Sequence, residues 1–195
     1  MSIFRSILKH ATRPMRAKSH GIIGERRVSS QLESLSSEDD EQKQIYNLIL
    51  VDEYGMSHQI DHIAIRKNGI FCIETKSYIG RVFGDKESER WIQRLYTGEK
   101  HEFYSPLKQN ETHCRKISNI LGPDYRVNSL VVMVKNNAAN INCENVINIS
   151  QLKAYLFSFD NGVILSTEKI EYVYNKLLNS ASDMTNAEHA RNVKK

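Results

Sequence analysis

The stretch that decides the fold is QIDHIAIRKNGIFCIETKSY, residues 59–78. Two apolar segments flank a Lys-Asn-Gly sequence, and Asn-Gly is the strongest short hairpin signal, because both residues tolerate the positive φ of a type I′ turn. The pattern therefore predicts a β-hairpin with strands over residues 59–66 and 70–77. Three ionisable side chains interrupt this otherwise apolar hairpin, and they are Asp61, Glu74 and Lys76.

The turn fixes which side chains meet. If Asn68-Gly69 is the two-residue turn, Lys67 pairs with Ile70, and Asp61 faces Lys76 across the strands. Side chains alternate between the two faces, so Asp61, Glu74 and Lys76 share one face. Asp61 and Glu74 are then diagonal neighbours, roughly 7–8 Å apart between backbones. A one-residue change of register would send Asp61 to the opposite face and separate the charges.

This group of charges has a chemical interpretation and a structural one. Two carboxylates at such a separation suit a hard cation such as Mg²⁺ or Mn²⁺. Such an ion polarises a phosphoryl oxygen and lowers the pKa of a bound water, while a nearby lysine neutralises charge that builds in the transition state. The three residues therefore outline metal-assisted phosphodiester hydrolysis. The structural alternative is an Asp61–Lys76 salt bridge, with Glu74 left to an arginine or to solvent.

The segments around the hairpin predict a mixed α/β fold. Pro106 suits the first position of a helix that Gly122-Pro123 closes, and NSLVVMV predicts a strand buried on both faces. The resulting order favours a central mixed β-sheet flanked by helices on both faces. We expect strands over residues 44–52, 81–84, 128–134 and 146–149, a hairpin over 90–96 and 101–104 turned at Thr97-Gly98, and helices over 19–35, 106–121, 150–159 and 166–179.

Length and composition are those of one globular domain. The chain has 195 residues, of which 40% are hydrophobic and 26% charged, enough for a real core. It has no apolar run of about 18 residues, so we expect no transmembrane segment. The N-terminus lacks the continuous apolar core of a secretory signal. Three widely spaced cysteines predict neither a disulfide framework nor a zinc site, so we expect a cytoplasmic protein.

Charge is unevenly distributed along the chain. Residues 1–30 carry seven Lys or Arg and a single acidic residue, Glu25. Apolar residues at helical spacing within residues 1–18 predict a basic amphipathic segment that docks on the body of the protein, on a partner or on a membrane surface. We therefore expect three parts: this segment, a domain over residues 19–179, and a polar C-terminal tail over residues 180–195 that is frayed.

Several motifs in order resemble a known family. They are Gly24-Glu25 on an early helix, QIDHIAI, NGIFCIETKSYIGRVFG, Trp91 and then SPLKQN at residues 105–110. Together these motifs, over roughly residues 19–155, resemble the NERD (nuclease-related) domain, which is similar to the PD-(D/E)xK nuclease superfamily. The resemblance implies a restriction-endonuclease-like core. The sequence departs from the pattern at two positions, where Ile60 replaces a proline and Ser105 replaces an asparagine.

The resemblance also implies roles for particular residues. Asp61 and Glu74 match the two metal-binding acids, and Glu25 matches the early-helix acid that helps to hold the metal or its water. Lys76 matches the catalytic lysine, and Gln109 matches a polar residue that faces the site from the next helix. The implied cofactor is Mg²⁺ or Mn²⁺.

Further candidates come from the residues themselves. His113, one turn after Gln109, can face the same cleft, although a lone helix histidine is more often structural. A set of cations on the two predicted helices gives candidate contacts to a nucleic-acid backbone, and a solvated helix face is an equal alternative. These cations are Arg26, Arg27, Lys108, Arg115 and Lys116.

The sequence thus predicts a divalent-metal-dependent nuclease, an endonuclease that acts on nucleic acid. DNA is favoured over RNA by the habits of the superfamily, and a homodimer is open because nucleases that cut both strands often dimerise. The first alternative is a catalytically weak or inactive nucleic-acid-binding or protein-interaction module on the same fold. The second is an interaction role centred on residues 1–18.

Overall fold

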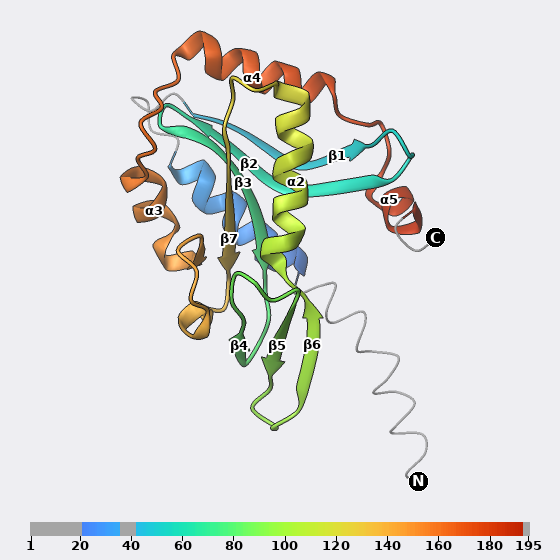
Figure 1. Ribbon diagram of the computed structural model, residues 1–195, viewed down its shortest axis with the longest axis vertical. Coiled ribbons are helices and arrows are strands. Elements are labelled where there is room, and N and C mark those ends of the chain that lie inside the picture. Colours follow the sequence, from blue (N-terminus) through green and yellow to red (C-terminus); the bar gives the residue numbers. More distant parts are fainter. Residues whose placement is uncertain (1–20, 36–41, 193–195) are drawn as a thin grey trace.

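The structure is a computed structural model that describes residues 21–35 and 42–192. The predicted basic segment over residues 1–18 lies outside the described residues, so its docking and the domain boundary after it stay predictions. A central sheet of five strands forms the body of the protein (Figure 1). Its strands are β1 (Lys43–Val51), β2 (Ser57–Arg66), β3 (Gly69–Lys76), β7 (Val127–Met133) and β8 (Val146–Asn148).

The central sheet is mixed, as predicted. Its order is β1-β2-β3-β7-β8; the pairs among β1, β2 and β3 are antiparallel, and β3, β7 and β8 run parallel. The chain reaches β7 from β3 through a long connection that contains a helix, as a parallel pair requires. The expected α/β fold class with a mixed sheet flanked by helices is therefore confirmed.

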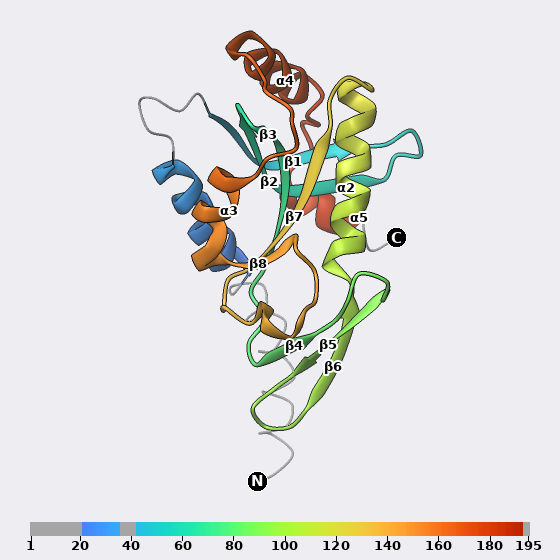
Figure 2. The same ribbon diagram turned by 60° about the vertical axis from the view of Figure 1, so that its left-hand side comes forward.

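Helices cover both faces of this sheet, and each face has its own apolar cluster (Figure 2). On one face, α2 (Pro106–Leu121) and α4 (Thr167–Asn179) contribute buried residues such as Ile117 and Val173. On the other face lie the helix described over residues 21–34 and α3 (Leu152–Ser158). Two short 3-10 turns, η1 (Ala138–Asn140) and η2 (Ile149–Gln151), adjoin β8.

A second sheet of three antiparallel strands forms beside the first. It consists of β4 (Arg81–Phe83), β5 (Arg90–Arg94) and β6 (Lys100–Tyr104), and it lies below the central sheet in Figures 1 and 2. The predicted hairpin turned at Thr97-Gly98 is present. The prediction did not separate this sheet from the central one, because strand periodicity shows that a segment is extended but not which sheet it joins.

The register of the β2–β3 hairpin differs from the prediction by two residues. Arg66 pairs with Gly69, so the turn is Lys67-Asn68 and not Asn68-Gly69. Asn68 does not take the positive φ that a type I′ turn needs, and its side-chain amide donates to the Leu156 and Phe159 carbonyls at 2.8 and 2.9 Å. Because the shift is even, it moves no side chain to the other face of the sheet.

The β1–β2 pair bends at Asp61. The residue opposite Asp61 in the register is Asn47, which has a φ of 53° and accepts a hydrogen bond from the Gln59 side chain. Ile60 and Ile63 both belong to the same apolar cluster, although residues three apart in a regular strand face opposite ways. The bend therefore interrupts the alternation of side chains along β2, so that Ile60 before Asp61 and Ile63 after it point to the same side of the sheet.

The C-terminal segment is not frayed over the residues that the structure describes. Helix α5 (Asn186–Asn192) lies against β2, where the Ser57 N–H donates to Asn192 Oδ1 at 3.0 Å and the Ser57 hydroxyl meets His189 Nδ1 at 2.7 Å. Since α5 buries no residue, it shows no apolar stripe in the sequence, and side-chain hydrogen bonds hold it instead. Within residues 21–35 and 42–192, no helix has the length and apolar character needed to cross a membrane.

Candidate functional site

A cleft of about 720 Å³ lies where several elements meet. Its walls come from the helix over residues 21–34, the first half of β2, the C-terminal end of β3, the β5–β6 hairpin, the start of α2, and α5. The cleft brings together all five residues that the resemblance implied for catalysis or metal binding. They are Glu25, Asp61, Glu74, Lys76 and Gln109.

Asp61 lies at the bend of β2, and its carboxylate is anchored from the neighbouring strand. Its Oδ2 accepts a hydrogen bond from the Thr75 N–H at 2.8 Å. The observed register, continued by one residue, sets Asp61 opposite Glu74 and not opposite Lys76. Burial raises the pKa of Asp61, and the neighbouring charge of Glu74 raises it further. The two carboxylates are thus close enough to oppose each other's ionisation.

Lys76 pairs with Glu74, and the expected alternative of an Asp61–Lys76 salt bridge is not formed. Lys76 Nζ lies 2.5 Å from Glu74 Oε1 and donates to Gln109 Oε1 at 3.0 Å. Burial alone would lower the pKa of Lys76, but the Glu74 carboxylate outweighs this effect and the net pKa is raised. Lys76 is therefore charged in the cleft, and contacts with Glu74 of β3 and Gln109 of α2 orient its ammonium group.

Glu74 is the most enclosed acid of the cleft, with 2% of its surface exposed. Burial opposes its ionisation, yet Lys76 and His113 together lower its pKa below the ordinary value. Its Oε2 lies 3.5 Å from His113 Nδ1 and has no hydrogen-bond partner among the described residues. A buried carboxylate oxygen without a donor is costly to keep, so this atom is suited to a further cation.

Glu25 reaches the cleft because its helix packs closely on β3. A β-carbon added to Gly24 would lie 3.0 Å from the Ser77 β-carbon and 3.4 Å from a Val134 methyl. Glycine at that position therefore allows the helix to approach, and the next residue points toward the cleft. Burial raises the pKa of Glu25, and the charge of Glu74 raises it further. Glu25 is therefore a third carboxyl group that feels the charges of the cleft.

These residues fit a hydrated divalent ion better than one held by protein atoms alone. Within the described ranges, no three His, Cys, Asp or Glu side chains converge as a complete metal cage. Asp61 and Glu74 nevertheless offer carboxylate oxygens from facing strands, and within residues 21–35 and 42–192 Glu74 Oε2 accepts no hydrogen bond and lies 3.5 Å from His113 Nδ1. Hard cations such as Mg²⁺ keep several waters and bind through one or two carboxylates, which this donor set can supply.

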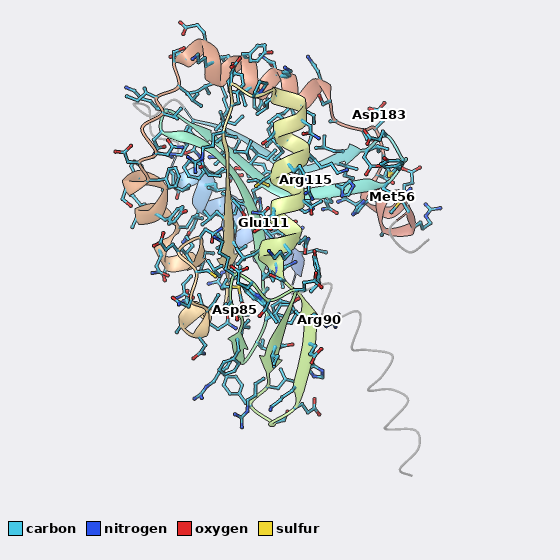
Figure 3. The ribbon with its side chains drawn as sticks, viewed as in Figure 1. Met56, Asp85, Arg90, Glu111, Arg115 and Asp183 are labelled. Carbon is cyan, nitrogen blue, oxygen red and sulfur yellow. The ribbon has the colours of Figure 1, made fainter. Side chains whose placement is uncertain are left out.

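The predicted nucleic-acid contacts lie outside the cleft. Arg26 and Arg27 are exposed on the helix over residues 21–34. Arg115 is exposed on α2 (Figure 3), where its guanidinium donates to the Thr112 hydroxyl at 3.3 Å. Lys108 lies 3.6 Å from Glu111, and Lys116 is bound to Asp52 at 2.7 Å. Lys108 and Lys116 therefore already have anionic partners, and a role of the five cations in binding nucleic acid stays a prediction.

Sequence reasoning missed two residues of the site region. Asn110 is fully buried, and its amide donates to the Cys72 carbonyl at 2.9 Å and the Ser129 hydroxyl at 2.9 Å. It therefore fixes α2 against β3 and β7; the PLKQN motif was the available signal, but the sequence analysis gave Asn110 no role. His189 lines the cleft from α5, and no local pattern pointed to it. His113, weighed as a structural histidine, contacts Glu74.

Comparisons with known proteins relate the sequence of the chain to a relative and to a family. An uncharacterized protein of Bacillus anthracis is 27% identical to the chain over 139 residues, which are 69% of this chain and 65% of the relative. The chain thus spans about two thirds of the length of that relative. No solved structure matches the chain. The profile of the nuclease-related domain (NERD) matches residues 20–134, which include all five cleft residues named above. The chain therefore belongs to the nuclease-related domain (NERD) family.

Proposed function

We propose that this chain is a divalent-metal-dependent nuclease that hydrolyses phosphodiester bonds, and that it acts as an endonuclease on DNA. One observation carries the proposal: Lys76 bridges Glu74 and Gln109 in the cleft that Asp61 lines from the facing strand. A lone E-x-K pair is common on strands. Here, in contrast, the lysine contacts both a buried glutamate and a glutamine of α2, and two further acids, Asp61 and Glu25, line the same cleft. This combination supports a reactive site.

Asp61 and Glu74 would hold Mg²⁺ or Mn²⁺, and Glu25 would bind a water or complete the ligand set. The ion, when bound, would polarise the phosphoryl oxygen and lower the pKa of a water. Lys76 would hold the attacking water and neutralise charge in the transition state. Gln109 would keep Lys76 aimed, since its Oε1 accepts from the ammonium.

The test is cleavage of plasmid and single-stranded DNA by the full chain with Mg²⁺ or Mn²⁺ and with EDTA. We expect Lys76→Ala and Glu74→Gln to lower the rate by about 100-fold or more, since each removes transition-state or metal stabilisation. Lys67→Ala and Glu111→Gln, which change exposed residues of the same types, should cleave as the wild type does. Equal residual activity in wild type and Lys76→Ala would refute the proposal.

A binding module without useful catalysis is the second candidate. It is favoured by one observation, namely that Lys76 occupies Glu74 Oε1 and that the described residues form no complete metal cage. This candidate predicts salt-sensitive DNA binding that survives Glu74→Gln, with no metal-dependent turnover by the wild type.

A further inference from the structure

The small sheet has a solvent-facing side that carries an unusual row of charges. Trp91 and Val82 point inward to an apolar cluster, so the residues that alternate with them point outward. Arg81 pairs with Arg94, and Arg94 pairs with Lys100. Three exposed cations, Arg81, Arg94 and Lys100, therefore stand side by side across three strands, and we call them the cation row.

The cation row works against the stability of the sheet. Like charges directly opposite on neighbouring strands are destabilising, and none of the three side chains has an ion pair or side-chain hydrogen bond within the part of the chain that the structure describes. The acid on the next outward row, Glu102, is bound to Arg90 at 3.1 Å. A charged arrangement that the fold does not compensate is suited to an anionic partner.

Aromatic and polar groups continue this surface from the cation row. Tyr96, at the end of β5, is 88% exposed. It lines a groove of about 390 Å³ together with Arg81, Lys135 and several asparagines, and none of the described residues that line this groove is acidic. Ile79 lines both this groove and the candidate cleft. The groove beside the cation row therefore adjoins the candidate cleft at Ile79.

We propose that this surface binds single-stranded DNA, with phosphates on the cation row and a base stacked on Tyr96, and that the strand passes Ile79 toward the cleft. The direction toward the cleft rests on the proposed nuclease function, whereas the binding does not. Neighbouring strands are about 4.8 Å apart, so the row spans about 10 Å. That length matches two or three phosphates of one strand. An unpaired base is what an exposed tyrosine can stack on.

The experiment is a fluorescence-polarisation titration of a labelled single-stranded oligonucleotide with the full chain in EDTA, at several salt concentrations. We expect the triple variant Arg81→Ala, Arg94→Ala, Lys100→Ala to bind about tenfold or more weakly, with a salt slope smaller by roughly 2, because each lost phosphate contact on a single strand removes about 0.7. The matched control is Lys67→Ala, Arg126→Ala, Lys169→Ala, which removes three exposed cations from the β2–β3 turn, the segment before β7 and α4. The control should bind as the wild type does.

Tyr96 gives a second pair of variants. Tyr96→Ala should weaken binding by about fivefold or more, since stacking on one base contributes at least that much, whereas Tyr96→Phe should retain it. Tyr54 is 82% exposed on the β1–β2 turn, and Tyr54→Ala is expected to have no effect. Thermal unfolding of the cation-row variant provides a folding check, because removing like charges should leave the melting temperature unchanged or raised.

The outcomes separate this inference from the proposed function. Equal affinity of wild type and cation-row variant, or equal weakening in the variant and its matched control, would overturn the inference even if the wild type cleaves DNA. Loss confined to the cation-row variant, without any metal-dependent cleavage, would support the inference while the nuclease proposal fails. Binding to phosphatidylserine vesicles that needs the cation row, with unchanged oligonucleotide binding, would also overturn it.

Discussion

At the scale of single residues, the register of one hairpin decides which charges meet. The sequence placed Asp61, Glu74 and Lys76 on one face, and a two-residue shift changed their pairing without changing that face. Lys76 therefore meets Glu74 instead of Asp61. The identity of the cleft residues was predictable from alternation and resemblance. The partner of each residue was not, because it depends on a turn conformation that Asn68 stabilises through hydrogen bonds to the carbonyls of Leu156 and Phe159 at the C-terminal end of α3.

Asn110 is an uncharged residue that also positions the site. It donates to the Cys72 and Leu130 carbonyls and to the Ser129 hydroxyl, and it accepts from the Cys72 thiol. These bonds fix α2, and with it Gln109, against β3. A sequence cannot show such a role, since an Asn in a helix is more often exposed than buried.

We expect Asn110→Ala to destabilise the protein by about 3 kcal/mol, because it leaves several buried groups without partners and creates a small cavity. Urea unfolding followed by circular dichroism measures the change. Asn119→Ala, on the exposed side of the same helix, should alter the free energy of unfolding by less than about 0.5 kcal/mol. Similar losses in the two variants would show that the buried amide does not hold α2.

At the scale of elements, the turn between β1 and β2 is tied to α2 through Asp52. Its Oδ2 accepts from Lys116 Nζ at 2.7 Å and from His58 Nε2 at 3.0 Å, and its Oδ1 accepts the Met56 N–H at 2.9 Å. The hydrogen bond from Lys116, followed by that from His58, holds the pKa of Asp52 well below its usual range. Helix α2 lines the cleft through Gln109, so this contact ties the β1–β2 turn to an element of the cleft.

The lowered pKa of Asp52 has a defined effect on stability against pH. A carboxyl group with a depressed folded pKa stabilises the protein above the unfolded value of about 4, and this contribution is lost as pH falls through the folded pKa. Asp52→Asn should therefore be less stable than wild type at neutral pH, and the two proteins should converge in acid. Urea titrations between about pH 2 and pH 7 test this, with the exposed Asp124→Asn as control. A stability difference that stays constant with pH contradicts the assignment.

Most elements were predictable, and two were not. The strands of the central sheet and α2 follow from periodicity and from Pro106, and their bounds agree with the structure to within two residues. The small sheet and α5 were missed as units. Sheet membership depends on packing around Trp91, which no local pattern reports. Helix α5 depends on hydrogen bonds to Ser57, far away in the sequence.

At the scale of the whole molecule, the two sheets meet around one cleft. The central sheet supplies Asp61, Glu74 and Lys76, the helix over residues 21–34 supplies Glu25, and α2 supplies Gln109. The small sheet supplies one wall of the cleft and carries the cation row on its outward side. A single-stranded segment on the cation row could reach the cleft past Ile79. The region that matches the family, residues 20–134, ends just after β7 and therefore includes the small sheet and all five cleft residues.

We propose that Asp61 and Glu74 form a metal site in which Lys76 is the neighbouring cation. A crystal structure of the full chain soaked in Mn²⁺, with anomalous scattering used to find the ion, tests this proposal. We expect an anomalous peak between the Asp61 and Glu74 carboxylates, and no peak in the Glu74→Gln variant. A cleft without a peak, in which Lys76 keeps its contact with Glu74 Oε1 at saturating Mn²⁺, would contradict it.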